Sequence, residues 1–107
     1  MITIDDFLKL ELKVGTVIQV EDVPGSDKLL RLMVDLGEEI PRQILSGIKQ
    51  WYKPEKLVGK QFIFIANLEP RQIMGMESQG MILCANGKKK PVCIKPVTRV
   101  SPGALIR

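Results

Sequence analysis

The residue types that usually carry out catalysis are scarce in this sequence of 107 residues. It contains no histidine, which removes Ser-His and Cys-His nucleophile pairs, imidazole metal ligands and the usual near-neutral general base. Carboxylates are present, but no two of them have a recognisable acid-base spacing, and no glycine-rich phosphate loop occurs. We therefore expect no catalytic residue, no metal site and no cofactor.

The two cysteines, Cys84 and Cys93, are nine positions apart. This spacing matches neither a C-x-x-C redox motif nor half of a common zinc site. Both lie in apolar, strand-like sequence, which favours buried free thiols, with a cross-strand pair as the alternative.

Lysine and arginine are unevenly distributed along the chain. Residues 1–41 carry four basic and nine acidic side chains, a net charge of −5, whereas residues 42–107 carry twelve basic and three acidic ones, net +9; together these give +4. A one-sided basic surface suits a polyanion, because neutralising phosphates releases counterions. A basic surface that only keeps the protein in solution is the alternative.

The hydrophobic pattern predicts a protein built mainly of strands. Alternating or continuous apolar residues predict six strands, at 14–20, 30–36, 42–46, 61–66, 80–85 and 92–94. In the first, the alternation should place four residues on one side: Val14, Thr16, Ile18 and Val20.

The remaining segments connect these strands. Residues 51–57, with Pro54 near the start and Gly59 beyond the end, predict a short helix. Trp51 and Tyr52 at its entry should plug the barrel, with stacking on bases as the alternative. Residues 67–79 have no clean period and predict a long ordered loop.

The order strand, strand, strand, helix, strand, strand is typical of an all-β, five-stranded OB-fold barrel, whose second and third strands often bind oligonucleotides. SH3-like and other small barrels fit the same pattern. There is no internal repeat or linker, so we expect a single domain over residues 1–107. The apolar runs are too short to span a bilayer and no signal segment is present, so we expect a cytoplasmic protein without a membrane partner.

Three groups of segments resemble a known family: KVGTV (13–17) with SDKL (26–29), SGI (46–48) with YKPEKLVGK (52–60), and ANLEPR (66–71) with MGMESQGMIL (74–83). They are similar to the tRNA-binding domain found in many methionyl-tRNA synthetases, in stand-alone structure-specific tRNA-binding proteins and in endothelial monocyte-activating polypeptide. The resemblance runs from about Phe7 to the C-terminus. Two departures are Gly25-Ser26 in the first turn and Gln72 after Arg71, where many relatives have a second basic residue.

The resemblance implies an OB fold with a small C-terminal β extension. It also implies recognition of the L-shaped body of tRNA, homodimers in free-standing members, and help to an aminoacyl-tRNA synthetase without catalysis. We expect a homodimer that uses apolar residues of the C-terminal segment: Val97, Val100, Ala104, Leu105 and Ile106.

The candidate tRNA-binding residues lie on strands two and three and in the segment before strand five. They are Lys28, Arg31, Arg42, Asn67, Arg71, Ser78, Gln79 and Met81. Arg71 has little structural reason for its position and favours a phosphate contact. Asn67 is more typical of a turn cap, and Ser78, Gln79 and Met81 suit either RNA contact or internal packing.

Two other functions fit the same barrel. A peptide-binding, export-chaperone-like protein is the first, although such relatives lose the Ser-Gln-Gly-Met segment that this chain has at 78–81. A module that only dimerises is the second.

Overall fold

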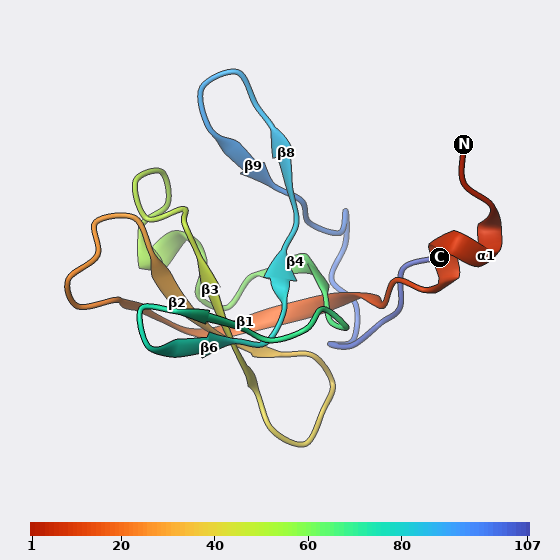
Figure 1. Cartoon of the computed structure of the whole chain (residues 1–107), viewed down its shortest axis with the longest axis horizontal. Coiled ribbons are helices and arrows are strands. Elements are labelled where there is room, and N and C mark those ends of the chain that lie inside the picture. Colours follow the sequence, from red (N-terminus) through yellow and green to blue (C-terminus); the bar gives the residue numbers. More distant parts are fainter.

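The computed structural model describes residues 1–107 and consists mainly of β-strands (Figure 1). Five antiparallel strands form one sheet in the order β3-β2-β1-β4-β7. Their bounds are Leu12–Asp22 for β1, Leu30–Asp35 for β2, Arg42–Ser46 for β3, Gln61–Ile65 for β4 and Met81–Ile82 for β7. The N–H of Gln79, just before β7, donates to the carbonyl of Gln43 in β3 at 2.8 Å, so the sheet nearly closes. The predicted five-stranded barrel is confirmed.

The barrel core follows from the alternation on β2. Leu30, Leu32 and Val34 are fully buried, whereas the residues between them are partly exposed. They belong to one cluster of 12 buried apolar residues. In β4 every residue is buried, and the C-terminal segment lies against this strand: the N–H of Ile63 donates to the carbonyl of Ile94 at 3.0 Å.

A β-bulge in β1 changes which residues face the core. Between Val17 and Gln19 the register against β2 shifts, which leaves Ile18 as an extra residue. Ile18 is therefore exposed although Val14 and Thr16 are buried, and Val17 is fully buried instead. The prediction that Ile18 shares their side fails because a bulge leaves no signature in the alternation.

The predicted short helix is a single 3-10 turn, η1, at Pro54–Lys56. Leu57 follows it and is fully buried in the barrel core. Trp51 does not plug the barrel as expected: it is 39% exposed, and Tyr52 packs against the core only in part.

The predicted loop at 67–79 contains a hairpin that the sequence analysis missed. Strand β5 spans Arg71–Ile73, β6 spans Met76–Ser78, and a two-residue turn joins them. Met74 and Gly75 in that turn have φ values of 51° and 78°. Two positive φ angles are the mark of a type I′ turn, which usually takes Asn-Gly or Asp-Gly, so Met-Gly gave no signal.

The predicted strand at 80–85 is divided between two sheets. β7 stays in the barrel, whereas β8, Cys84–Asn86, pairs with β9, Pro91–Cys93, in a hairpin with a lysine-rich tip. Cys84 stands opposite Cys93 and their Sγ atoms lie 3.5 Å apart as free, half-buried thiols. Burial raises the pKa of the Cys84 thiol to about 12.

The C-terminal residues run beside β1. The N–H of Val14 donates to the carbonyl of Ala104 at 2.9 Å, and the N–H of Ile106 donates to that of Leu12 at 2.8 Å. The buried side chain of Gln61 fixes the segment further, because it hydrogen-bonds both the N–H and the carbonyl of Val100 at 3.0 and 2.7 Å.

A short helix at the N-terminus was not predicted. α1 spans Ile4–Leu8 and begins with a capping box in which Thr3 and Asp6 exchange side-chain and backbone hydrogen bonds. It projects away from the barrel beside the C-terminus (Figure 1), and none of its residues is buried. No helix has the length and apolar character needed to cross a membrane.

Candidate nucleic-acid interface

The segment before β7 closes the barrel through hydrogen bonds to β3. Ser78 is buried, and its hydroxyl accepts from the N–H of Leu45 at 3.0 Å and donates to the carbonyl of Gly80 at 3.1 Å. The side-chain carbonyl of Gln79 accepts from the N–H of Gln43 at 3.0 Å. These two predicted site residues therefore join β3 to β7 through hydrogen bonds inside the protein.

Gly80 allows this closure because no larger residue fits. Its φ is 144°, and a Cβ there would lie 2.9 Å from the carbonyl oxygen of Ile65 and 3.2 Å from the side chain of Ile44. The chain can thus enter β7, where Met81 pairs with Ile65 and keeps 42% of its surface exposed.

Arg42 ties three segments together. Its Nε and Nη2 donate to the two carboxylate oxygens of Glu38, each at 2.7 Å. Its Nη1 donates to the carbonyls of Ala66, after β4, and of Gln79, before β7, the latter at 3.2 Å. The hydrogen bonds from Arg42 hold the pKa of Glu38 below its usual value. The positive charge is already neutralised and engaged within the protein.

Arg31 is also engaged with protein partners. Its Nε donates to the side-chain carbonyl of Gln43 at 2.6 Å, and its Nη1 lies 3.4 Å from a carboxylate oxygen of Glu21. Gln43 in turn donates to the carbonyl of Glu77 in β6 at 2.8 Å. Sequence reasoning missed Gln43, because its partners lie 12 to 36 residues away and no local pattern marks them.

Asn67 holds the N-terminal arm, residues 1–11, against the end of β4. Its Oδ1 accepts from the N–H of Glu11 at 2.8 Å and its Nδ2 donates to the carbonyl of Lys9 at 2.8 Å. The structural role favoured for Asn67 is therefore present, with a clasp between distant segments in place of a local turn cap.

Lys28 and Arg71, by contrast, extend exposed side chains that form no ion pair. Lys28 lies in the β1–β2 turn, where the hydroxyl of Ser26 accepts from its N–H at 3.2 Å. Arg71 opens β5. The β5–β6 hairpin approaches the β1–β2 turn, because the methyl carbon of Met74 lies 3.7 Å from the place that a Cβ on Gly25 would take. We use the name hairpin face for three exposed residues of this turn and hairpin: Lys28, Arg71 and Met74.

Ion pairs are confined to the first half of the chain. The five pairs are Lys9–Asp6, Lys13–Glu11, Arg31–Glu21, Arg42–Glu38 and Lys49–Asp22. The basic residues after position 49 form none: Lys53, Lys56, Lys60, Arg71, Lys88, Lys89, Lys90, Lys95, Arg99 and Arg107. Their charge is available to an anionic ligand.

Comparison with known proteins gives this basic barrel a family. Residues 12–105 match the family described as "Putative tRNA binding domain". The chain belongs to this tRNA-binding domain family. The match leaves only residues 1–11 and 106–107 outside it, so these 107 residues carry no catalytic domain besides.

Individual relatives agree with the family match. Methionine–tRNA ligase of Methanothrix thermoacetophila is 51% identical over 107 residues, which are 100% of this chain and 16% of the enzyme. The chain thus spans less than a fifth of that relative. The crystal structure of a MetRS-related protein from Pyrococcus horikoshii superimposes with a TM-score of 0.92 and 39% identity, over 100% of this chain and 98% of that one.

A second kind of relative has the same fold. The crystal structure of chaperone CsaA from Bacillus anthracis superimposes with a TM-score of 0.88 and 30% identity, over 100% of this chain and 99% of that one. The resemblance to the tRNA-binding domain family, drawn from the sequence motifs, is confirmed.

Proposed function

We propose that this chain binds folded tRNA, catalyses no reaction, and forms one domain over residues 1–107. The family match over residues 12–105 carries the proposal. The unpaired basic side chains support it, because phosphate contacts supply much of the affinity for a nucleic acid.

The candidate residues divide into two roles in this proposal. Lys28 and Arg71 contact phosphates from the hairpin face, and Met81 in β7 offers an exposed apolar surface. Arg31 contributes less, because Glu21 already offsets its charge. The other four, Arg42, Asn67, Ser78 and Gln79, hold the binding surface in shape.

The test is a titration with folded tRNA at several salt concentrations. Arg71→Ala and Lys28→Ala should each lower the slope of log affinity against log salt by about 0.9 and weaken binding to different tRNAs by similar factors. Lys89→Ala is the control, because it removes the same charge at the tip of the β8–β9 hairpin. It should change the affinity less. Unchanged affinity in both test variants would mean that tRNA binds elsewhere.

The same proposal includes a protein partner and a location in the cell. A domain of this kind serves an aminoacyl-tRNA synthetase, methionyl-tRNA synthetase above all, by raising the local concentration of tRNA, and the relatives that carry this name support that partner. Charging of tRNA takes place in the cytoplasm, where we place the protein.

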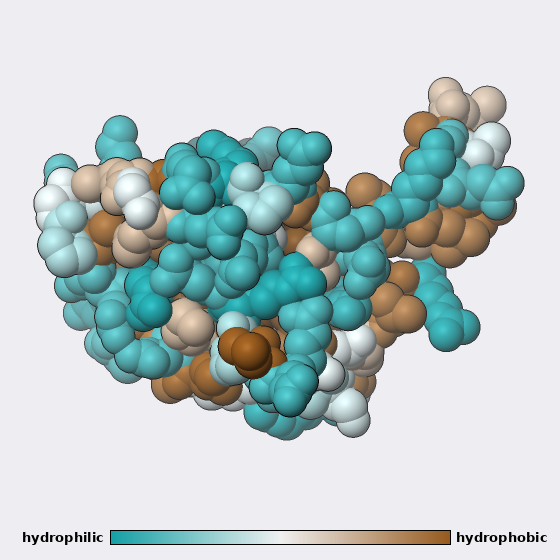
Figure 2. Space-filling model, turned by 60° about the horizontal axis from the view of Figure 1, so that its bottom comes forward, coloured by the Kyte–Doolittle hydropathy of each residue, from teal (hydrophilic) through white to brown (hydrophobic).

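In the proposed homodimer, two copies of the chain meet through the N-terminal arm and the C-terminal segment. Ile4, Leu8 and Leu10 on the arm are exposed, and so is Leu105 on the C-terminal segment. A hollow of about 360 Å³ separates the two segments and is lined by Leu8, Leu10, Leu105 and Ile106. Figure 2 shows apolar side chains along the projecting arm, next to a largely hydrophilic barrel. A helix of five residues needs tertiary contacts to be stable, and a second copy would supply them.

Sedimentation of the full chain tests the dimer. The parent should be a dimer at micromolar concentration. Leu8→Glu should give a monomer whose circular dichroism spectrum is that of the parent. A parent that sediments as a monomer would remove the dimer from the proposal without affecting tRNA binding.

Peptide binding is the second candidate function, favoured by the likeness to chaperone CsaA. It predicts affinity for apolar peptides that does not depend on salt. Affinity for tRNA that falls steeply with salt, with no peptide binding, would eliminate it.

A further inference from the structure

A basic hollow lies beside η1 and shares no residue with the hairpin face. It measures about 350 Å³ and combines three aromatic rings with four lysines and one cysteine: Trp51, Tyr52, Phe62, Lys56, Lys60, Lys90, Lys95 and Cys93. No carboxylate lines it. We call it the tryptophan pocket. Its volume is in the range of small-ligand sites.

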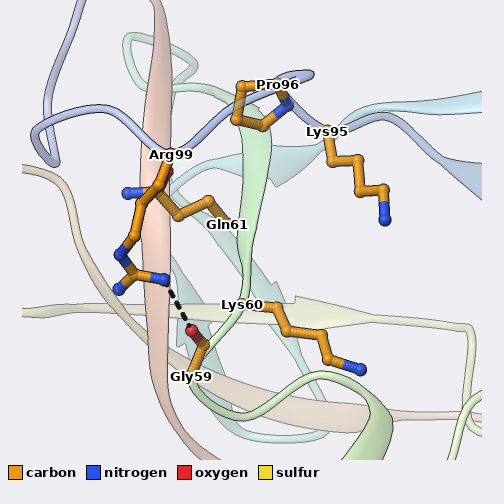
Figure 3. A pocket seen from close by; sticks show the side chains of 6 residues that line it. All are labelled: Gly59, Lys60, Gln61, Lys95, Pro96 and Arg99. Atoms are coloured by element: carbon orange, nitrogen blue, oxygen red, sulfur yellow. Dashed lines mark hydrogen bonds between the residues drawn. The ribbon is translucent and has the colours of Figure 1, made fainter.

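Lys60 and Lys95 connect this pocket to a second hollow of about 250 Å³, which Arg99 also lines. Figure 3 shows the side chains of Lys60 and Lys95 extending to the same side, while Arg99 lies on the other side and donates to the carbonyl of Gly59 at 3.1 Å. Neither lysine has an acidic partner. Two free ammonium groups therefore stand between the two hollows.

Trp51 and Tyr52 differ in what they offer a ligand. The hydroxyl of Tyr52 donates to the carbonyl of Pro91 at 3.0 Å and accepts from the N–H of Cys93 at 3.2 Å, and Lys90 lies 5.2 Å from the centre of its ring. Tyr52 thus anchors the C-terminal hairpin. Trp51 belongs to no core cluster and is 39% exposed.

A turn fixes the position of Trp51, because the N–H groups of Trp51 and Tyr52 both donate to the carbonyl of Ile48 at 3.0 Å. The indole is thus held outside the core cluster, partly exposed, in a pocket lined by four lysines. An aromatic plane flanked by cations is the combination that binds an unpaired base together with its phosphates.

We propose that the tryptophan pocket holds one unpaired nucleotide of RNA, with its base stacked on Trp51 and its flanking phosphates on Lys60 and Lys95. The inference deepens the proposed function and rests on it in one respect, that the nucleotide belongs to a bound tRNA. The pocket itself is tested with a short single strand, which needs no folded tRNA.

Trp51 is the only tryptophan, so its fluorescence reports on the pocket directly. We expect a single-stranded RNA tetranucleotide to quench this fluorescence saturably. The double variant Lys60→Ala, Lys95→Ala should bind the tetranucleotide about 10- to 30-fold more weakly at 0.1 M salt, with a log-log salt slope lower by about 1.4. Lys88→Ala, Lys89→Ala removes the same charge at the hairpin tip and should change affinity by less than about threefold.

Folded tRNA supplies the second readout. Trp51→Leu should weaken its binding by about fivefold or more, the value of one stacked base, with the circular dichroism of the barrel unchanged.

The inference is overturned if the parent binds folded tRNA while the tetranucleotide leaves Trp51 fluorescence unchanged, or if the two double variants lose affinity equally. Equal quenching by a tetraglutamate peptide would also overturn it, in favour of an acidic peptide ligand. If the tetranucleotide binds as expected but folded tRNA does not, the pocket stands and the proposed function fails.

Discussion

The two halves of the chain use their positive charges differently. Residues 1–49, the paired region, contain all five ion pairs, whereas the basic residues of 50–107, the unpaired region, form none. Within the paired region only Lys28 lacks an acidic partner. The difference teaches that net charge along a sequence locates a ligand surface only in part. A basic residue is free for a ligand when no neighbouring carboxylate has already neutralised it.

The largest expected effect is a difference in the free energy of unfolding between the variants of Arg42 and Lys60. Arg42→Ala removes a bidentate ion pair and two hydrogen bonds to backbone carbonyls, so we expect the free energy of unfolding to fall by about 2–3 kcal/mol. Lys60→Ala, in the unpaired region, should change it by no more than about 0.5 kcal/mol. Urea denaturation measures both. Equal losses would mean that the two regions do not differ in this way.

Ser78→Ala should cost less, about 1–2 kcal/mol, because it leaves the N–H of Leu45 without its partner in a buried position. The salt slope for tRNA should stay that of the parent. Arg71→Ala should show the opposite, an unchanged stability and a lower slope. Thermal melts and tRNA titrations on these two variants test the two roles. A Ser78→Ala protein that is fully stable but binds tRNA weakly would show that Ser78 contacts the RNA.

Acid should weaken the paired region selectively. The pKa of Glu38 is lowered by its hydrogen bonds with Arg42, so the ionised form contributes stability above pH 4.5 that is lost as the pH falls through the lower folded value. Glu38→Gln should lack this part of the acid sensitivity. Denaturation midpoints between about pH 6 and 3 measure it, and parallel curves for parent and variant would contradict the assignment.

The smallest effect at neutral pH concerns Cys84, in the unpaired region. Burial, followed by the neighbouring Cys93 thiol, raises its thiol pKa to about 12. Thiol reagents should therefore react slowly at pH 7. Because the folded pKa exceeds the usual 9.0, stability should decline as the pH rises from about 9 to 12. Rapid modification of the native protein at pH 7 would disagree.

The sequence predicts β2 best, because regular alternation marks the buried side of this strand. The fully buried Leu30, Leu32 and Val34 follow directly from period two. The β5–β6 hairpin and the exposure of Ile18 were missed, since an unusual turn residue and a bulge leave no pattern.

The candidate site was only partly predictable for a related reason. Whether a basic side chain is bound within the protein depends on residues distant in sequence. Arg42, for example, donates to the carbonyls of Ala66 and Gln79, whereas Lys28 and Arg71 form no ion pair. The tryptophan pocket carried one local sign, lysines at 56 and 60 close to the only tryptophan. Its other walls are Phe62 of β4 and residues between 90 and 95, and no local pattern connects the latter to it.

The most direct test of the account is the affinity of the parent protein for one tRNA in its folded form and in an unfolded form of the same sequence, each measured over a range of salt concentrations. We predict tighter binding of the folded form, with log affinity falling linearly against log salt through several phosphate contacts. Equal affinity for the two forms would contradict recognition of the tRNA shape, and an affinity that does not change with salt would contradict a role for the unpaired basic residues.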